Sequence, residues 1–446
     1  MNTRACTAEK FTDENGEKMN RKNAKYLIIL FILAMCLSFC ACGESESETS
    51  PEAVSEPEVA ETPAPTPTPV PICTILGQKV RADAETLDLS AITEEEISDV
   101  AQELTQLTGL KTIVLGSESE ERPLSWEGIR ELHDAAPQAA IDYSFTIFKK
   151  QFNLSDEEMD LKHIKMDDEG ELVKAVTACM TNLTYLDMDS CQVSNEKMAE
   201  IRDSLPNANV VWRIKFGRFY SVRTDVEKIL ASMPGKAGEL VHNNVEALKY
   251  CTKVKYIDLG HNNYLNTIEF CRYMPDLEVA VLALNAVEDF SPLAECPKLE
   301  YLEAFTSRLH DLTPLAECKN LRHLNICYNF AINDITPLYD LPNLERVWIG
   351  KYDPVPPEQI AKLRELHPNC VVNDTTEDPT AEEWRFSNVG DAMGNPRYAE
   401  RYALLKEQFG YTEDDYAYYW LDPLYDYSWI PPEVEPDAVE DFPYVP

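Results

Sequence analysis

The most regular hydrophobic pattern of the chain lies in residues 251–350, where apolar positions recur every 22 or 23 residues. In each copy, apolar residues stand three and then two positions apart, and a landmark residue follows three positions later. The five copies read Val254, Ile257, Leu259 and Asn262; Leu277, Ala280, Leu282 and Asn285; Leu299, Leu302, Ala304 and Ser307; Leu321, Leu324, Ile326 and Asn329; Leu344, Val347, Ile349 and Tyr352. Alternation of this kind places the apolar side chains on one face of a short strand. One such strand cannot bury its face alone, so the pattern predicts stacked strands about 4.8 Å apart.

The second half of each copy repeats as well. Residues 289–293, 311–315 and 334–338 share the pattern D-[FLI]-[ST]-P-L in register. The Pro prevents strand continuation and directs the chain to the opposite side of the stack. The first half of each copy matches L-x-x-L-x-L-x-x-N, the leucine-rich repeat signature. The spacing and the ending resemble the internalin-type class, and this resemblance implies an α/β solenoid with a parallel concave β-ribbon and a helical or 3₁₀ convex side.

Residues 72–250 carry longer and less regular repeats with helices. Strand patterns fit at 87–89, 110–115 and 183–191, and more weakly at 161–166; helical patterns cover 94–107, 126–135 and 194–204. Each larger unit ends in an extra strand after a Pro, at Pro137 and at Pro206. Residues 226–250 predict a bridging helix. We therefore expect one continuous solenoid over residues 72–375, without a separate catalytic domain.

The N-terminal region has the features of an export signal. In residues 1–42, basic residues precede an apolar run and then Ala41-Cys42-Gly43, which resembles a bacterial lipobox and predicts lipidation at Cys42. Met19 opens a more conventional signal peptide and is an alternative start of the protein. An uncleaved signal anchor is the alternative to cleavage. Residues 43–71 are acidic, rich in Pro and without basic residues, which predicts a disordered tether.

Residues 376–446 predict a C-terminal cap and tail. A helix is expected over 357–367 and a last strand over 369–372. After an acidic loop and the Trp384-Arg-Phe segment, an amphipathic helix over 397–411 is expected to cover the last repeat, because solenoids need capping. The tail beyond it is rich in Tyr and acidic residues.

Composition and motifs exclude several function classes. The formal net charge of -38 argues against nucleic acid or anionic lipid as the main partner. No zinc spacing, H-E-x-x-H motif or G-x-S-x-G elbow is found in the sequence, so we expect no enzyme, no metal site and no cofactor. Cys251, Cys296 and Cys318 occupy a repeated core position, where reduced thiols act as small apolar groups.

The intervening strand residues predict a ligand surface on the concave face. Aromatic and Arg side chains of the kind that dominate binding hot spots gather there. The candidate ligand-binding residues, named here the concave patch, are Tyr256, Tyr301, Phe305, His323, Arg346 and Trp348. The favoured function is a surface receptor or adhesin for a protein or glycan. A structural, self-associating envelope protein is the alternative, and a concave face covered by the C-terminal tail would favour it.

Taken together, the chain resembles leucine-rich repeat lipoproteins of Firmicutes. The matching features are the Ala41-Cys42-Gly43 segment, the Asp-Leu-Gly-His-Asn262 repeat, the repeated D-x-[ST]-P-L motif, residues 344–350 and residues 401–411. The resemblance covers residues 72–430 and implies a protein held by a lipid on the outer face of the cell membrane. It is specific for the fold and names no ligand.

Overall fold

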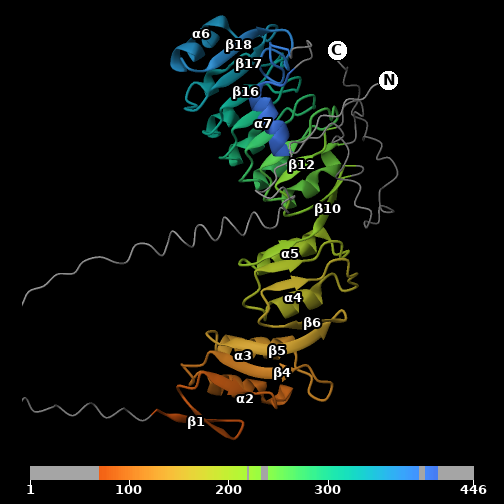
Figure 1. The fold of residues 1–446 in the computed structure, drawn as a ribbon, viewed down its shortest axis with the longest axis vertical. Helices are drawn as coiled ribbons and strands as arrows, with labels where there is room; N and C mark the ends of the chain where they lie inside the picture. Colours follow the sequence, from red (N-terminus) through yellow and green to blue (C-terminus); the bar gives the residue numbers. More distant parts are fainter. Residues whose placement is uncertain (1–69, 218–219, 233–239, 391–396, 410–446) are drawn as a thin grey trace, which may run out of the picture. The chain divides into compact units, whose positions relative to one another are not determined.

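The computed structural model describes residues 70–217, 220–232, 240–390 and 397–409, which all belong to one compact unit beginning at Pro69 (Figure 1). The export signal with Cys42, the tether up to residue 69 and the tail from residue 410 lie outside the described residues. Among the helices of the described residues, none is both long and apolar enough to span a bilayer.

The regular repeats form one sheet of seven parallel strands in chain order. Ile257, Ala280, Leu302, Leu324 and Val347 stand side by side on neighbouring strands and are fully buried, which confirms the repeat register. The strands are β12 (Lys228–Leu230), β13 (Tyr256–Asp258), β14 (Val279–Val281), β15 (Tyr301–Glu303), β16 (His323–Asn325), β17 (Arg346–Gly350) and β18 (Val371–Thr376).

The opposite side of these repeats consists of short 3₁₀ helices, as the D-x-[ST]-P-L motif predicts. Asp289 accepts a hydrogen bond from the Ser291 N–H over 2.8 Å, and Asp311 does the same for Thr313 over 2.8 Å. The carboxylate thus satisfies a free N–H at the start of each helix, and the following Pro needs no donor. These helices are η2 (His242–Asn244), η3 (Glu246–Tyr250), η4 (Glu269–Tyr273), η5 (Ser291–Glu295), η6 (Thr313–Glu317) and η7 (Thr336–Leu338).

The landmark Asn residues hold the turn that follows each strand. Asn262 Nδ2 donates to the Leu259 and Ala231 carbonyls, each over 2.9 Å, and Asn329 Nδ2 donates to Ile326 over 2.8 Å. The residue before the landmark adopts a left-handed conformation in four successive repeats: His261, Leu284, Thr306 and Tyr328 have φ between 52° and 62°. Hydrogen bonds that link neighbouring repeats therefore stabilise a backbone conformation that L-residues rarely adopt.

The first half of the array is built from a longer unit. Three units each begin with a β-hairpin, and equivalent core residues such as Leu87, Met159 and Ile229 recur about 70 residues apart. The first two units contain β1 (Ile72–Ile75), β2 (Gln78–Arg81), β3 (Thr86–Asp88), η1 (Glu94–Glu96), α2 (Ile97–Leu104), β4 (Thr112–Ser117), α3 (Trp126–Ala135), β5 (Ala140–Ile147), β6 (Lys150–Asn153), β7 (Glu158–Asp160), α4 (Glu171–Thr177), β8 (Tyr185–Asp187), α5 (Asn195–Ser204) and β9 (Asn209–Val211). The hairpin of β10 (Arg213–Phe216) and β11 (Tyr220–Arg223) opens the third.

The hairpins correct the expectation of one continuous ribbon. β6 pairs with β5 in antiparallel orientation and ends the first sheet, so β7–β9 form a separate three-stranded sheet before β12 starts the seven-stranded one. The recurring extra strand after Pro137 and Pro206 is confirmed, and each extra strand continues into such a hairpin.

Two further local expectations were wrong. Residues 228–230 form β12 and not part of a bridging helix, because Ile229 fills the same core position as Ile257 on the next strand. The strand expected at 161–166 lies at β7 instead, where Met159 is the buried residue.

The C-terminal elements are α6 (Pro357–Leu366), β18 and α7 (Glu400–Phe409). β18 adds to β17, and α6 packs against β18 at the end of the array. Helix α7 does not cap the last repeat as expected. It lies across the strand faces (Figure 1). Lys228 Nζ of β12 donates a hydrogen bond of 2.9 Å to the carbonyl of Phe409, the last residue of α7.

Candidate functional site

The strands bring the concave patch together, but the patch is covered. Tyr301, His323 and Arg346 are neighbours in register, and Trp348 stands two residues beyond Arg346 on β17. Tyr301 is 0% exposed, Trp348 2%, Phe305 3% and His323 4%. Tyr256 and Arg346 are half-buried. The predicted contiguity is thus confirmed, whereas the described arrangement does not present an open ligand surface.

The cover is residues 377–390 together with α7, named here the cover segment. Trp384, Leu405 and Phe409 of this segment are at most 1% exposed and form a second core with the patch. The Trp384 ring lies 5.3 Å from Tyr301 and 5.2 Å from Trp348, measured between ring centroids. Burying three side chains of this size contributes about 1.5–3 kcal/mol each before the cost of ordering the segment.

A buried carboxylate lies at the centre of the covered face. Glu303, on β15, is fully buried and accepts hydrogen bonds from Tyr301 OH, from Trp384 Nε1 over 2.7 Å and from Arg385 Nε over 3.0 Å. Arg385 also forms an ion pair with it and is 16% exposed. Burial lowers the pKa of Arg385 but the Glu303 charge raises it, and the net direction is upward. A buried charge needs such full pairing, because an unpaired one is strongly destabilising.

Arg346 and His323 lie at the edge of the patch. Arg346 Nη1 donates to the Glu383 carbonyl over 2.7 Å, and the guanidinium lies 4.5 Å from the Trp384 ring centroid. Arg346 Nε donates to His323 Nδ1 over 3.2 Å, which requires a neutral imidazole with its proton on Nε2. Burial, followed by the charge of Arg346, lowers the pKa of His323 to about 3.

Further bonds fasten the cover segment along the sheet. Asn325 Nδ2 donates to the Pro379 carbonyl over 2.8 Å, and Tyr328 OH donates to the Glu377 carbonyl. At the other end the Phe409 ring lies 5.8 Å from Tyr256. The segment is therefore bonded from β16 to β12, by side chains that the repeats place on their strand faces.

The sequence pattern did not predict that Glu303, Trp384 and Arg385 interact. Glu303 stood in one of the predicted concave columns, between apolar Val281 and polar Asn325. The signal available was an acidic residue among aromatic neighbours, together with a Trp-Arg pair outside the repeats. Nothing in the periodicity connects two positions separated by 82 residues.

The thiols lie where the repeat position predicts. Cys251, Cys296 and Cys318 are fully buried, and burial raises the pKa of both Cys296 and Cys318 to about 12. Thiols of this kind are poor nucleophiles and poor metal ligands. Within the described ranges, no group of three or more His, Cys, Asp or Glu side chains has a geometry that fits a metal ion.

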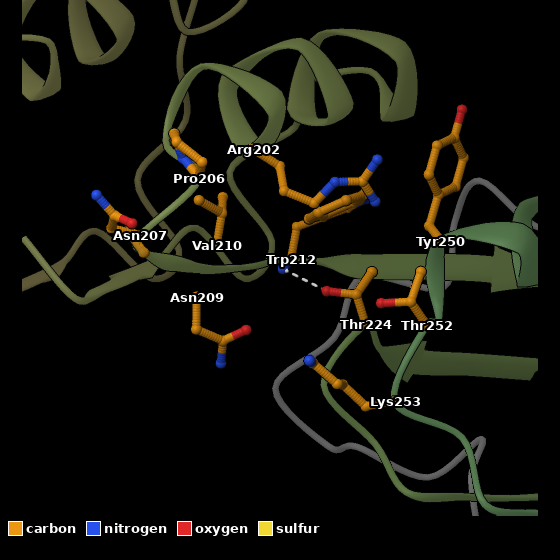
Figure 2. A pocket seen from close by; sticks show the side chains of 11 residues that line it. Arg202, Pro206, Asn207, Asn209, Val210, Trp212, Thr224, Tyr250, Thr252 and Lys253 are labelled. Carbon is orange, nitrogen blue, oxygen red and sulfur yellow. Dashed lines mark hydrogen bonds between the residues drawn. The ribbon is translucent and has the colours of Figure 1, made fainter. Parts of the chain in front are cut away.

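A recess of about 350 Å³ lies at the junction of the second and third units, where α5 gives way to slimmer 3₁₀ helices. Figure 2 shows the Arg202 guanidinium over the Trp212 ring, 5.7 Å from its centroid, and the bond of 3.2 Å from Trp212 N to Thr224 Oγ1. Trp212 is 2% exposed, so Arg202 occupies the face on which a sugar ring would stack. The recess therefore combines amide and hydroxyl groups with the cations Arg202 and Lys253 and with apolar surface.

Among known proteins, only solved structures show a similarity to this chain. No family model matches the chain, and no curated protein matches it. An internalin of Listeria monocytogenes is 18% identical with a TM-score of 0.29, over 62% of this chain and 66% of that one, just under two thirds of its length. Internalin C2 of the same species is 20% identical with a TM-score of 0.29, over 52% and 88% of the two chains. A leucine-rich repeat protein of Leptospira interrogans is 14% identical with a TM-score of 0.30, over 61% and 74%. TM-scores this low carry no argument about this chain. Its leucine-rich repeat architecture is therefore assigned from its own strand registers.

Proposed function

We propose that this chain is an exported, lipid-anchored binding protein whose concave patch recognises a protein or glycan. The observation that carries the proposal is the occupied patch. Its aromatic and Arg side chains, with Glu303, already hold a polypeptide segment by ring contacts and charge-assisted hydrogen bonds. These are the interactions that dominate hot spots in protein interfaces.

An outside partner reaches the concave patch only when the cover segment moves aside. The cover segment is only partly buried, since Phe386 is 37% exposed while Trp384 is buried. The cover segment then competes with the partner, so the apparent affinity equals the intrinsic affinity multiplied by the fraction of molecules that are open.

The alternative is a structural envelope protein without a discrete ligand. The covered patch favours it, because an apolar strand face that is permanently filled supports the fold and recognises nothing. In that case the cover segment is a second core and Trp348 contributes to stability alone.

Affinity capture from the envelope of the producing cell, read by mass spectrometry, separates the two functions. The baits are the wild-type chain, Trp384→Ala/Arg385→Ala, which loosens the cover, and the same pair with Trp348→Ala. We expect a specific partner to be enriched on the second bait relative to both others. Equal capture on all three, with self-association of the chain, would instead support the structural alternative.

The lipid anchor has its own test. The apolar run followed by Ala41-Cys42-Gly43 supports diacylation at Cys42 and placement on the outer face of the membrane. We expect a fatty-acid probe to label the wild-type chain and to leave Cys42→Ala unlabelled. Labelling that persists in this variant would move the site to Cys40 or remove the anchor from the proposal.

A further inference from the structure

One part of the concave patch remains accessible beside the cover segment. A recess of about 590 Å³ opens where the first residues of β16 and β17 meet the first turn of α7. Its charged lining consists of Arg322, Arg346 and Arg401 and the four carboxylates of Glu300, Glu345, Glu383 and Glu400, and His323 lies beside them. The recess therefore joins residues of the strand face to residues of the cover.

The charges in this recess are not balanced in pairs. Arg322 is neutralised by Glu345, at 2.6 Å, and by Glu300, at 3.5 Å. Arg346 and Arg401, in contrast, form no ion pair with any carboxylate of the described residues. Arg346 Nη2 and Arg401 Nε are also buried without a hydrogen-bond partner there. Arg401 contacts the Tyr301 ring, 5.8 Å from its centroid, and donates no hydrogen bond within the described chain.

The two arginines also act on each other and on His323. Burial lowers the pKa of Arg346, and the charge of Arg401 lowers it further. His323 stays neutral beside both arginines, so it adds no third unpaired cation. Glu303 and Glu345 act on the Arg346 charge without forming an ion pair with it, so Arg346 Nη2 and Arg401 Nε remain donors without an acceptor in the described chain. An oxyanion satisfies both guanidinium groups, because its oxygens accept several N–H donors at once.

We infer that this recess is an anion-binding subsite, in which Arg346 and Arg401 together hold a carboxylate or phosphate group. The inference rests on the proposed binding role of the concave face, where it supplies a charged anchor point for the partner. Glu400, which is exposed and forms no ion pair within the described ranges, is the chain's own competitor for Arg401. The shared chemistry is an oxyanion, whether it is a carboxylate of a polypeptide or a phosphate.

The test is isothermal titration of the full-length chain with inorganic phosphate and, separately, with succinate, at ionic strength kept constant with NaCl. We expect saturable binding of at least one anion, weakened tenfold or more by Arg401→Gln. The matched control is Lys406→Gln, which removes a cation from the same helix where it contacts Tyr398, 4.1 Å from the ring centroid, outside the recess. This control should bind as the wild type does.

A gain-of-binding variant guards against misfolding as an explanation. Glu400→Gln removes the competing carboxylate, so anion binding should become two- to threefold tighter. Preference for succinate or for phosphate assigns the carboxylate or the phosphate class. Absence of saturable binding of either anion, or equal binding by Arg401→Gln and wild type, would overturn the inference. Such a failure leaves the capture experiment with the loosened cover unaffected, so the two proposals fail separately.

Discussion

The strand faces of the two halves of the repeat array differ in polarity and in what covers them. On β3, β5 and β7 of the first two units, residues that alternate with the core are polar and exposed, as at Asp88, Asp142 and Glu158, whereas Asp187 of β8 and Val211 of β9 are buried. In the regular repeats the same positions hold Val279 and Tyr301, which are at most 1% exposed. Both halves bury the same kind of core on the other face of the strands. The alternate positions alone therefore decide whether the face stays in water or needs an occupant.

The hairpins contribute to the same difference. In the first half they divide the strands into short sheets, whereas seven strands from β12 to β18 run on without an insertion. An uninterrupted face is long enough to bind a segment that extends from β16 back to β12. The comparison teaches that one repeat geometry supports two kinds of surface, and in this chain the face covered by a long segment belongs to the uninterrupted sheet.

The largest expected effect comes from the carboxylates of the two faces. Glu303→Ala leaves the Arg385 charge buried without its partner, so the free energy of unfolding should fall by about 3–5 kcal/mol. Glu158→Ala, on the exposed face of β7, should leave that free energy nearly unchanged. Urea denaturation of both variants measures the difference, and a similar loss in the two would break the comparison.

A smaller loss is expected from the cover itself. Trp384→Ala removes a fully buried ring that contacts Tyr301 and Trp348 and should cost about 3 kcal/mol. Limited proteolysis should then cleave within residues 377–409 first, because the loosened segment opens before the repeats do. Phe386→Ala is the control, since Phe386 is 37% exposed. Cleavage that begins in the repeats instead would show that the two cores unfold as one.

The third prediction concerns pH. Because the pKa of His323 is lowered to about 3 from its usual 6.5, the fold favours the neutral ring. Its contribution to stability is complete above pH 6.5 and is lost as the pH falls toward 3. His323→Gln should therefore lose less stability than the wild type between pH 6.5 and pH 4, measured by urea midpoints at each pH. If stability falls equally with pH in the two proteins, the fold does not favour the neutral form of the His323 ring.

The smallest effect is expected at Asp353, outside both faces. Asp353 Oδ2 accepts the N–H groups of Gly350 and Tyr328, but burial raises its pKa to about 6 and Oδ1 has no partner. Its folded pKa lies above the unfolded value, so this group favours the fold at low pH and loses that advantage as the pH rises to 6. After discounting for partial exposure, Asp353→Asn should be about 1 kcal/mol more stable at pH 7 and no more stable at pH 3.5. Melting curves at both pH values check this; a stabilisation that does not depend on pH contradicts it.

Much of the fold follows from the sequence because its determinants are local and repeated. The positions of Leu302 and Leu324, the Asp at the start of each 3₁₀ helix and the Asn of each turn are set by spacing within one repeat and its neighbour. The errors occurred where the chain departs from the regular repeat of 22 or 23 residues, as at the hairpins and at β12. Residues 226–250 predict a helix, but Ile229 fills the strand core position that Ile257 fills in the next repeat.

What the sequence alone determined is therefore the repeat, its register and the residues that share the concave face. The tertiary structure decided what that face touches. The bonds from Trp384 and Arg385 to Glu303 join positions 81 and 82 residues apart, and no periodicity predicts such a pairing. An aromatic strand face has the same pattern whether it waits for a partner or is filled by its own chain. Only the path of the chain after β18, which turns back across the sheet, distinguishes the two, because burial depends on where the segment lies and not on its spacing.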